Sequence, residues 1–270
     1  YRAGLWRVDL GRQRINWGRH LVWNPNDLFN AYNFFDFDYA ERPGTDALRL
    51  RRLVGGNGMN ELEFAIRPGG EDRKPLLASL FRWNAGGIDG QILAARVEGA
   101  FAAGAAASAG WGAFGVKAEG TFFGPSETWS NGGLISASLG LDASWGEGGF
   151  AQLAVLKSPE ASGFLDFSLQ SAQRPWQLMP LPWTGMVQAM IPMGPRARFG
   201  TAILLAPDDF SDLLVAMPSL TLDAATNLTA SLVVQHVSLR LNAVEIPQWQ
   251  SASSAFYVSL QWDFRRRFQI

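Results

Sequence analysis

The chain has 270 residues, of which 47% are hydrophobic and 17% charged, with a formal net charge of −1 and no cysteine. The lack of cysteine excludes a disulfide scaffold, a cysteine-based zinc site and a thiol enzyme. The lack of a basic excess argues against nucleic-acid binding, because nothing would neutralise the phosphates. The chain begins at Tyr1, so we expect either that a signal peptide has been removed or that the N-terminus is incomplete.

Two uncharged stretches are long enough to raise the question of a membrane-spanning helix. Residues 99–116 consist mainly of Gly and Ala, and residues 178–195 contain four prolines. Glycine costs about 1 kcal/mol per residue in a helix interior, and proline breaks a helix. Neither stretch is therefore expected to cross a membrane as a helix.

Hydrophobic residues recur with a period of two along most of the chain, which predicts β-strands. The clearest example lies near the C-terminus, where Phe256, Val258 and Leu260 alternate with polar residues. No helical periodicity of any length competes with this pattern. About fourteen strands are predicted, near residues 2–16, 45–53, 60–67, 76–84, 89–97, 100–108, 111–123, 133–146, 149–157, 179–193, 197–206, 212–222, 227–239 and 254–264.

The first predicted strand contains a change of phase. An unbroken strand would place Arg12 and Arg14 on the same face as Leu10, and an Arg at the middle of a bilayer costs about 2–4 kcal/mol. A β-bulge at Gly11 would turn both arginines to the opposite face. With this bulge, the predicted outward-facing residues are Trp6, Val8, Leu10, Ile15 and Trp17.

The predicted connections alternate between short turns and longer loops, which is typical of outer-membrane barrels. The short turns lie near residues 54–59, 84–89, 109–110, 146–148, 194–196 and 223–226. Most of the intervening connections are longer or more polar, with residues 17–44 the longest. An even number of strands then places both termini in the periplasm. The predicted fold is a transmembrane antiparallel up-and-down β-barrel of about 14 strands.

The alternative all-β fold is a soluble sandwich or a lipocalin-like barrel. Its polar faces would meet water and carry many Lys and Glu, whereas the polar faces here are rich in Ser, Thr, Gln and Gly. Small neutral side chains suit a crowded or water-filled lumen, and lipid requires an apolar exterior with every backbone group paired. Predicted strand ends also carry tryptophans, as an aromatic girdle would: Trp17, Trp83, Trp111, Trp145, Trp183 and Trp262.

Two segments resemble known outer-membrane proteins. The sequence VDLGRQRINWG at residues 8–18, followed by LVWNPNDLFN at residues 21–30, resembles a block in porin-like outer-membrane proteins of Gram-negative bacteria. The ending Trp262-Asp263-Phe264 is similar to their aromatic C-terminal strand, although the tail at 265–270 runs past it. The resemblance implies one outer-membrane barrel domain over residues 1–270, with a porin or transporter function and further strands upstream.

Charged and polar side chains on the predicted inward faces would line the lumen. One interpretation is a charged constriction that filters solutes, with Arg favouring anions. The other is a ladder of salt bridges that merely fills the lumen. The predicted pore-lining residues are Arg7, Asp9, Arg12, Arg14, Arg49, Arg51, Glu61, Glu63, Arg67, Arg96, Glu98, Lys117, Glu119, Tyr257, Gln261 and Asp263.

The predicted loop at residues 17–44 is long and rich in aromatic residues. Loops of this length inside a compact domain are usually functional or disordered, and the aromatic content favours order. We expect this loop to fold into or over the mouth of the barrel and to narrow the pore. The alternative is an exposed cap that contacts a partner or lipopolysaccharide.

Enzymatic activity is not expected. His236 and Ser238 share one predicted strand face, but nucleophilic catalysis also needs hydrogen-bond reach and an orienting third group. A His-x-Ser pattern arises often by chance. We expect no catalytic residue, cofactor or metal site.

The function that the sequence favours is an outer-membrane pore for passive diffusion of small polar or charged solutes. The first alternative is a closed structural barrel that acts as a scaffold or partner in a cell-envelope complex. The second is a transporter of apolar small molecules, suggested by Met186, Met190, Val215 and Met217 on inward positions. The expected partners are outer-membrane lipid and lipopolysaccharide, small polar solutes, and a second copy or an envelope partner, but no nucleic acid.

Overall fold

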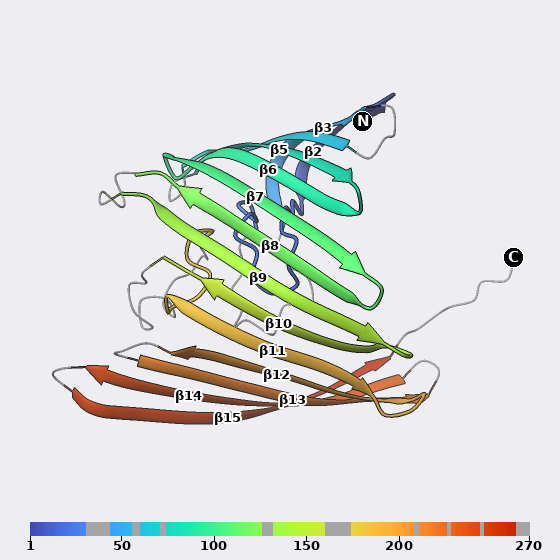
Figure 1. The fold of residues 1–270 in the computed structure, drawn as a ribbon, viewed down its shortest axis with the longest axis vertical. Helices are drawn as coiled ribbons and strands as arrows, with labels where there is room; N and C mark the ends of the chain where they lie inside the picture. Colours follow the sequence, from blue (N-terminus) through green and yellow to red (C-terminus); the bar gives the residue numbers. More distant parts are fainter. Residues whose placement is uncertain are drawn as a thin grey trace, which may run out of the picture. The chain divides into compact units, whose positions relative to one another are not determined.

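The computed structural model describes residues 1–30, 44–55, 60–70, 74–125, 132–159, 174–207, 211–225, 228–243 and 246–262. Within these ranges the chain is all-β, and fifteen strands follow one another in one antiparallel up-and-down sheet (Figure 1). The predicted all-β, up-and-down architecture is confirmed. The hydrogen-bonded order runs from β1 to β15 and stops there, so the closed transmembrane barrel stays a prediction. The part of the chain described here holds no helix long and apolar enough to span a membrane.

The strands agree closely with the predicted segments. The one addition is β1, a two-residue strand that pairs with the start of β2. The strands are β1 Arg2–Ala3, β2 Trp6–Gln13, β3 Thr45–Val54, β4 Asn60–Arg67, β5 Leu76–Ala85, β6 Ile88–Val97, β7 Ala100–Trp111, β8 Phe114–Phe123, β9 Leu134–Trp145, β10 Gly149–Lys157, β11 Trp183–Pro192, β12 Ala197–Pro207, β13 Ser211–Ala225, β14 Leu228–Ala243 and β15 Ile246–Trp262.

The chain groups into two compact units. Unit 1 consists of Tyr1–Gly140 and Val155–Pro182, and unit 2 of Leu141–Ala154 and Trp183–Ile270. The single domain over residues 1–270 stays a prediction. Almost all of the predicted charged site residues fall in unit 1.

The sheet of unit 1 has two chemically different faces. One face, here called the open face, carries large hydrophobic residues whose exposed fraction ranges from 41% to 84%. They are Leu10, Leu48, Phe64, Ile66, Leu77, Ile92, Phe101, Phe122 and Leu139. The other face, here called the covered face, carries buried residues of the alternate positions, including Ala65, Leu80, Ala102 and Glu119. Strand alternation therefore separates the two faces as the period of two predicts.

The covered face is packed against residues 15–30, here called the inner segment. Strand β2 ends at Gln13, and the chain then crosses this face; in Figure 1 the blue trace passes across β6 to β8. Ile15, Trp17, Leu28 and Phe29 join a buried cluster with Leu76, Leu80 and Leu93. Burial of such side chains contributes about 1.5–3 kcal/mol each.

The prediction that Ile15 and Trp17 face outward is therefore wrong. Ile15 is fully buried and Trp17 is 1% exposed. The Trp17 ring meets the Phe29 ring edge to face, with centroids 5.2 Å apart. Both residues follow the end of β2, so the alternation of that strand no longer dictates their direction.

The predicted bulge at Gly11 is also wrong. Strands β2 and β3 pair one to one from Trp6 opposite Arg52 to Gln13 opposite Thr45, with Gly11 opposite Ala47. Gly11 has a φ of 111°, in a region that favours glycine. The register does not shift at this residue.

Strand β7 has only small side chains where it faces the inner segment. Its covered face consists of Ala100, Ala102, Gly104 and Ala106, none larger than alanine. A Cβ placed on Gly104 would lie 2.6 Å from Oδ1 of Asn26. The small residues of this strand therefore let the inner segment approach the sheet closely.

Candidate functional site

A cluster of arginines and carboxylates lies on the covered face of β2 and β3. Asp9 accepts hydrogen bonds from Nε of Arg7 at 2.9 Å and from Nη2 of Arg51 at 2.7 Å. These side chains are between one fifth and one half exposed. A single carboxylate thus serves two guanidinium groups, which leaves positive charge on this part of the face.

A second, deeper group centres on Glu63 of β4, which has no exposed area. Arg49 donates to both carboxylate oxygens of Glu63, at 2.6 and 2.8 Å, and the indole N–H of Trp17 donates at 2.7 Å. Arg82 lies 3.6 Å from the same carboxylate and 3.3 Å from Glu61. Buried charges of this kind are stable only when they are paired and hydrogen-bonded, as they are here.

Glu119 of β8 holds the backbone of the inner segment. This carboxylate is 4% exposed and accepts the backbone N–H groups of Arg19 at 2.7 Å and Asn26 at 2.6 Å. Hydrogen bonds from N–H groups to a carboxylate are about twice as strong as neutral ones. Glu119 is therefore the central anchor of residues 19–26.

Three further polar side chains of the covered face bind the inner segment. Gln91 donates to the carbonyl of Trp17 at 2.6 Å, and Ser138 donates to the carbonyl of Trp23 at 3.3 Å. The Thr121 hydroxyl lies 2.6 Å from Oδ1 of Asn26. The described part of the predicted loop at 17–44 thus lies against the sheet, and residues 31–43 lie outside the described residues.

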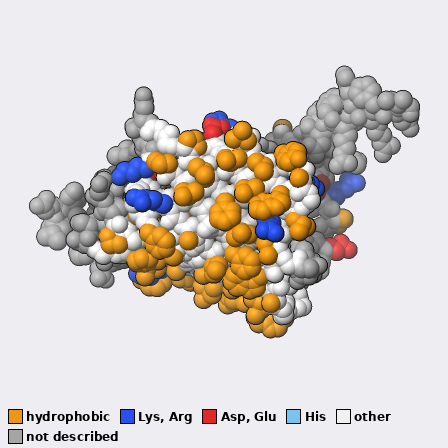
Figure 2. All heavy atoms as spheres, turned by 90° about the horizontal axis from the view of Figure 1, so that it is seen from above, with side chains coloured by type: hydrophobic (Ala, Val, Ile, Leu, Met, Phe, Trp, Pro, Cys, Tyr) orange, Lys and Arg blue, Asp and Glu red, His pale blue; other side chains and the backbone are white. Residues whose placement is uncertain are grey.

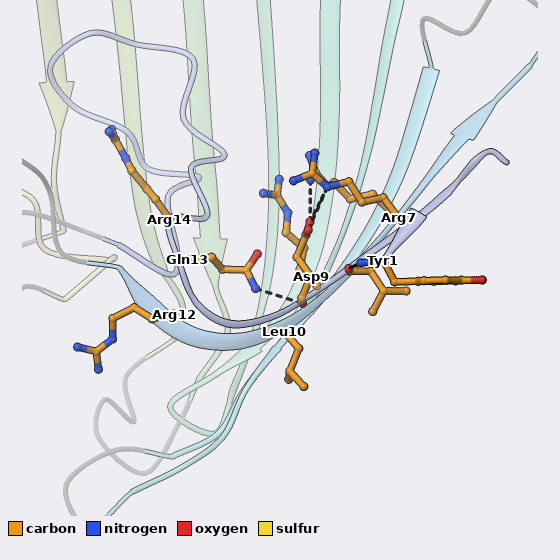
Figure 3. A pocket seen from close by; sticks show the side chains of 10 residues that line it. Tyr1, Arg7, Asp9, Leu10, Arg12, Gln13 and Arg14 are labelled. Atoms are coloured by element: carbon orange, nitrogen blue, oxygen red, sulfur yellow. Dashed lines mark hydrogen bonds and ion pairs between the residues drawn. The ribbon is translucent and has the colours of Figure 1, made fainter. Parts of the chain in front are cut away.

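A pocket of about 430 Å³ opens beside the arginine cluster, and we call it the arginine pocket. Figure 3 shows Asp9 joined to Arg7, while Leu10 and Arg12 point away from this group and the Arg14 side chain extends separately from Asp9. The residues that line the pocket are Tyr1, Arg7, Val8, Asp9, Leu10, Arg12, Gln13, Arg14, Arg49 and Arg51.

Most of the predicted pore-lining residues of unit 1 share the covered face. Arg14 follows β2 and is exposed at the arginine pocket, and Glu98 lies in the β6–β7 turn, 3.6 Å from Arg67. The residues on the covered face itself are Arg7, Asp9, Arg49, Arg51, Glu61, Glu63, Arg67, Lys117 and Glu119.

Two of the predicted pore-lining residues, Arg12 and Arg96, lie on the open face of unit 1 instead. Arg12 pairs with Asp46 at 2.8 Å, and both side chains are more than half exposed. Because the register is unbroken at Gly11, Arg12 keeps the parity of Leu10. Arg96 is exposed and lies four residues after Ile92 in β6, so the two share a face.

The remaining predicted residues belong to unit 2 or beyond. Tyr257 and Gln261 are exposed in β15, and the Tyr257 hydroxyl donates to Gln235 at 3.3 Å. Asp263 lies outside the described residues. Of the proposed apolar lining, Met186 and Val215 are buried, whereas Met190 is 39% exposed.

His236 of β14 is hydrogen-bonded, but to a different serine from the one considered above. Its Nδ1 lies 2.9 Å from Oγ of Ser254 on β15. Within the described ranges no third side chain is hydrogen-bonded to His236. A catalytic triad needs such a third group to orient the histidine.

Trp17, Gln91, Thr121 and Ser138 were missed as site residues. The last three lie on the predicted polar faces, but an uncharged side chain carries no signal of what it binds. The only hint was the run of asparagines at 24, 26 and 30, since these side chains often satisfy backbone groups in irregular segments.

Comparison with family models and with curated proteins finds no match to this chain. The resemblance to porin-like proteins therefore depends on the segment at residues 8–30 and on the aromatic ending, and it stays a prediction.

Proposed function

We propose that this chain is an outer-membrane β-barrel through which small polar or charged solutes diffuse passively, with an interior narrowed by the inner segment. The observation that carries the proposal is the inverted polarity of unit 1. Its open face exposes large apolar side chains, whereas its covered face buries Arg49, Glu63 and Glu119.

Water is an unfavourable solvent for such an open face. Exposed apolar area costs about 25 cal/mol per Å², and soluble monomers rarely expose apolar patches beyond a few hundred Å². Figure 2 shows many hydrophobic side chains on the face in view, with charged groups gathered in a few places. Lipid contact makes this surface favourable, and a closed ladder of strands satisfies the backbone.

The second candidate is a closed structural barrel in a cell-envelope complex. The observation that favours it is the density of bonds that hold the inner segment to β6, β8 and β9. A segment held this firmly would block passage. The two candidates differ in one measurable quantity, the ionic current through the inserted protein.

The experiment is single-channel recording of the full chain in planar bilayers. The pore predicts stable current steps in the wild type and a larger current in Glu119→Ala, because this variant removes the acceptor for the Arg19 and Asn26 amides. The matched control is Glu147→Ala, an exposed carboxylate in the turn after β9. Silence of both inserted proteins would favour the closed barrel, and failure to enter lipid would exclude both.

A further inference from the structure

We propose that the arginine pocket is a binding site for a small solute that carries two or more carboxylate or phosphate oxygens. This inference deepens the proposed function, on which it rests, by naming the class of solute that the interior recognises.

The charge balance of the pocket is positive. Five arginines line the pocket: Arg7, Arg12, Arg14, Arg49 and Arg51. Asp9 is the only carboxylate of the lining, while Glu63 accepts hydrogen bonds from Nε and Nη2 of Arg49, and Asp46 pairs with Arg12. Three carboxylates thus meet five guanidinium groups, so the pocket attracts anions.

The donors of these arginines are only partly used. Each guanidinium has five N–H groups, yet Arg7 uses Nε alone and Arg51 uses Nη2 alone on Asp9. Nε of Arg51 is buried without an acceptor. The Arg7 side chain is 46% exposed, so its unused N–H groups can donate to oxygens supplied by a ligand.

Arg14 contributes an exposed guanidinium group to the site. It has no hydrogen-bond or ion-pair partner within the described part of the chain, and it is exposed at the pocket. Figure 3 shows its side chain apart from the group of Asp9 and Arg7. Gln13 precedes Arg14 and also lines the pocket. Its side-chain amide donates to the backbone carbonyls of Asp9 at 3.2 Å and Ala47 at 3.0 Å, and these bonds fix its position in the pocket wall.

The size and the side-chain chemistry narrow the ligand further. A volume of about 430 Å³ falls in the lower range of small-molecule sites, which run from about 300 to 1,000 Å³. The planar guanidinium matches carboxylate and phosphate oxygens in pairs. Lipid phosphate offers the same chemistry, but the paired arginines Arg7 and Arg51 lie on the face opposite the apolar one. A soluble polyanion is therefore the ligand we assign.

The test is isothermal titration calorimetry on the full chain in a neutral detergent. The probes are citrate and inorganic phosphate, with glucose as the neutral solute and purified lipopolysaccharide as the lipid source of phosphate. We expect saturable binding of citrate and phosphate and none of glucose. Arg14→Gln, which removes no hydrogen bond or ion pair among the described residues, should weaken citrate binding about tenfold.

The matched control is Arg96→Gln, which removes the same charge from an exposed arginine of the open face that does not line the pocket. Citrate affinity should then stay within twofold of the wild type. Equal losses in both variants would mean diffuse attraction rather than a site, and would overturn the proposal. Binding of lipopolysaccharide alone, or no binding of citrate and phosphate, would overturn it too.

The outcome is separable from the proposed function. Current steps in bilayers without citrate binding would support the proposed pore function and contradict the proposed anion site. Citrate binding that depends on Arg14, in a chain that gives no current, would support the anion site and contradict the pore function.

Discussion

The indole N–H of Trp17 donates to the buried carboxylate of Glu63 across a distance of 2.7 Å and 46 residues of sequence. The same carboxylate accepts hydrogen bonds from Nε and Nη2 of Arg49. The apolar cluster that contains Trp17 and the charged network of β3 and β4 therefore meet at one side chain. Loss of that side chain should affect both.

Glu63→Gln should lower the free energy of unfolding by about 3 kcal/mol. The substitution leaves Arg49, whose side chain is 12% exposed, without its carboxylate, and broken buried pairs cost about 3–5 kcal/mol. The measurement is urea unfolding in lipid vesicles, followed by tryptophan fluorescence. Asp46→Asn breaks an exposed pair with Arg12 and should cost less than about 1 kcal/mol. Similar costs for the two variants would contradict the assignment.

Glu119→Ala should release the inner segment while the sheet persists. Two backbone N–H groups lose their acceptor in this variant, so amide hydrogens of residues 19–26 should exchange at least tenfold faster. Hydrogen exchange followed by mass spectrometry measures this directly. Peptides from β4 and β5 should keep the wild-type rate, and Glu147→Ala should change neither region. Unchanged exchange at 19–26 would show that Glu119 is not the anchor.

Gly104→Val should displace the inner segment from β7. An added Cβ would lie 2.6 Å from Oδ1 of Asn26 and 2.8 Å from Oγ1 of Thr121, and overpacking costs about 1–3 kcal/mol. Unfolding in urea and exchange at residues 23–28 both report the change. Gly120→Ala is the control, because its nearest added contact, the Ser136 carbonyl oxygen, is an ordinary 3.5 Å. A fully stable Gly104→Val would contradict the close approach.

Ile92→Arg tests the open face. Ile92 is 51% exposed near the middle of β6, and an Arg facing the bilayer midplane costs about 2–4 kcal/mol. Folding into lipid vesicles should therefore weaken by that amount, measured from urea titrations. Ile92→Ala should cost clearly less. If the open face met water, Ile92→Arg would change stability very little and would raise solubility.

Alternation along the sequence predicted the strands well because each one has a clear difference between its faces. In β9, Leu139 is half exposed and Ser138 is 5% exposed, as the period of two requires. In β5 the sequence alternates less clearly, for a physical reason. Leu80 packs beneath the inner segment while Leu77 lies on the open face, so both faces are apolar.

The inner segment could not be predicted in the same way. Trp17 is compatible with an aromatic girdle and with a buried core, and only the end of β2 at Gln13 decides between them. The segment after that end is bound by residues about a hundred positions later, such as Glu119. The direction of Arg12 depended on a bulge that the register does not contain.

The bonds of the inner segment also impose an order on biogenesis. Asn26 and Arg19 reach Glu119 over 93 and 100 residues, and Trp23 reaches Ser138 over 115. Until β8 and β9 have been synthesised and paired, Ile15, Leu28 and Phe29 have no complete surface to cover them. Contacts between such distant residues are slow to form. A nascent chain that stalls before β8 would therefore expose a hydrophobic N-terminal segment to chaperones and proteases.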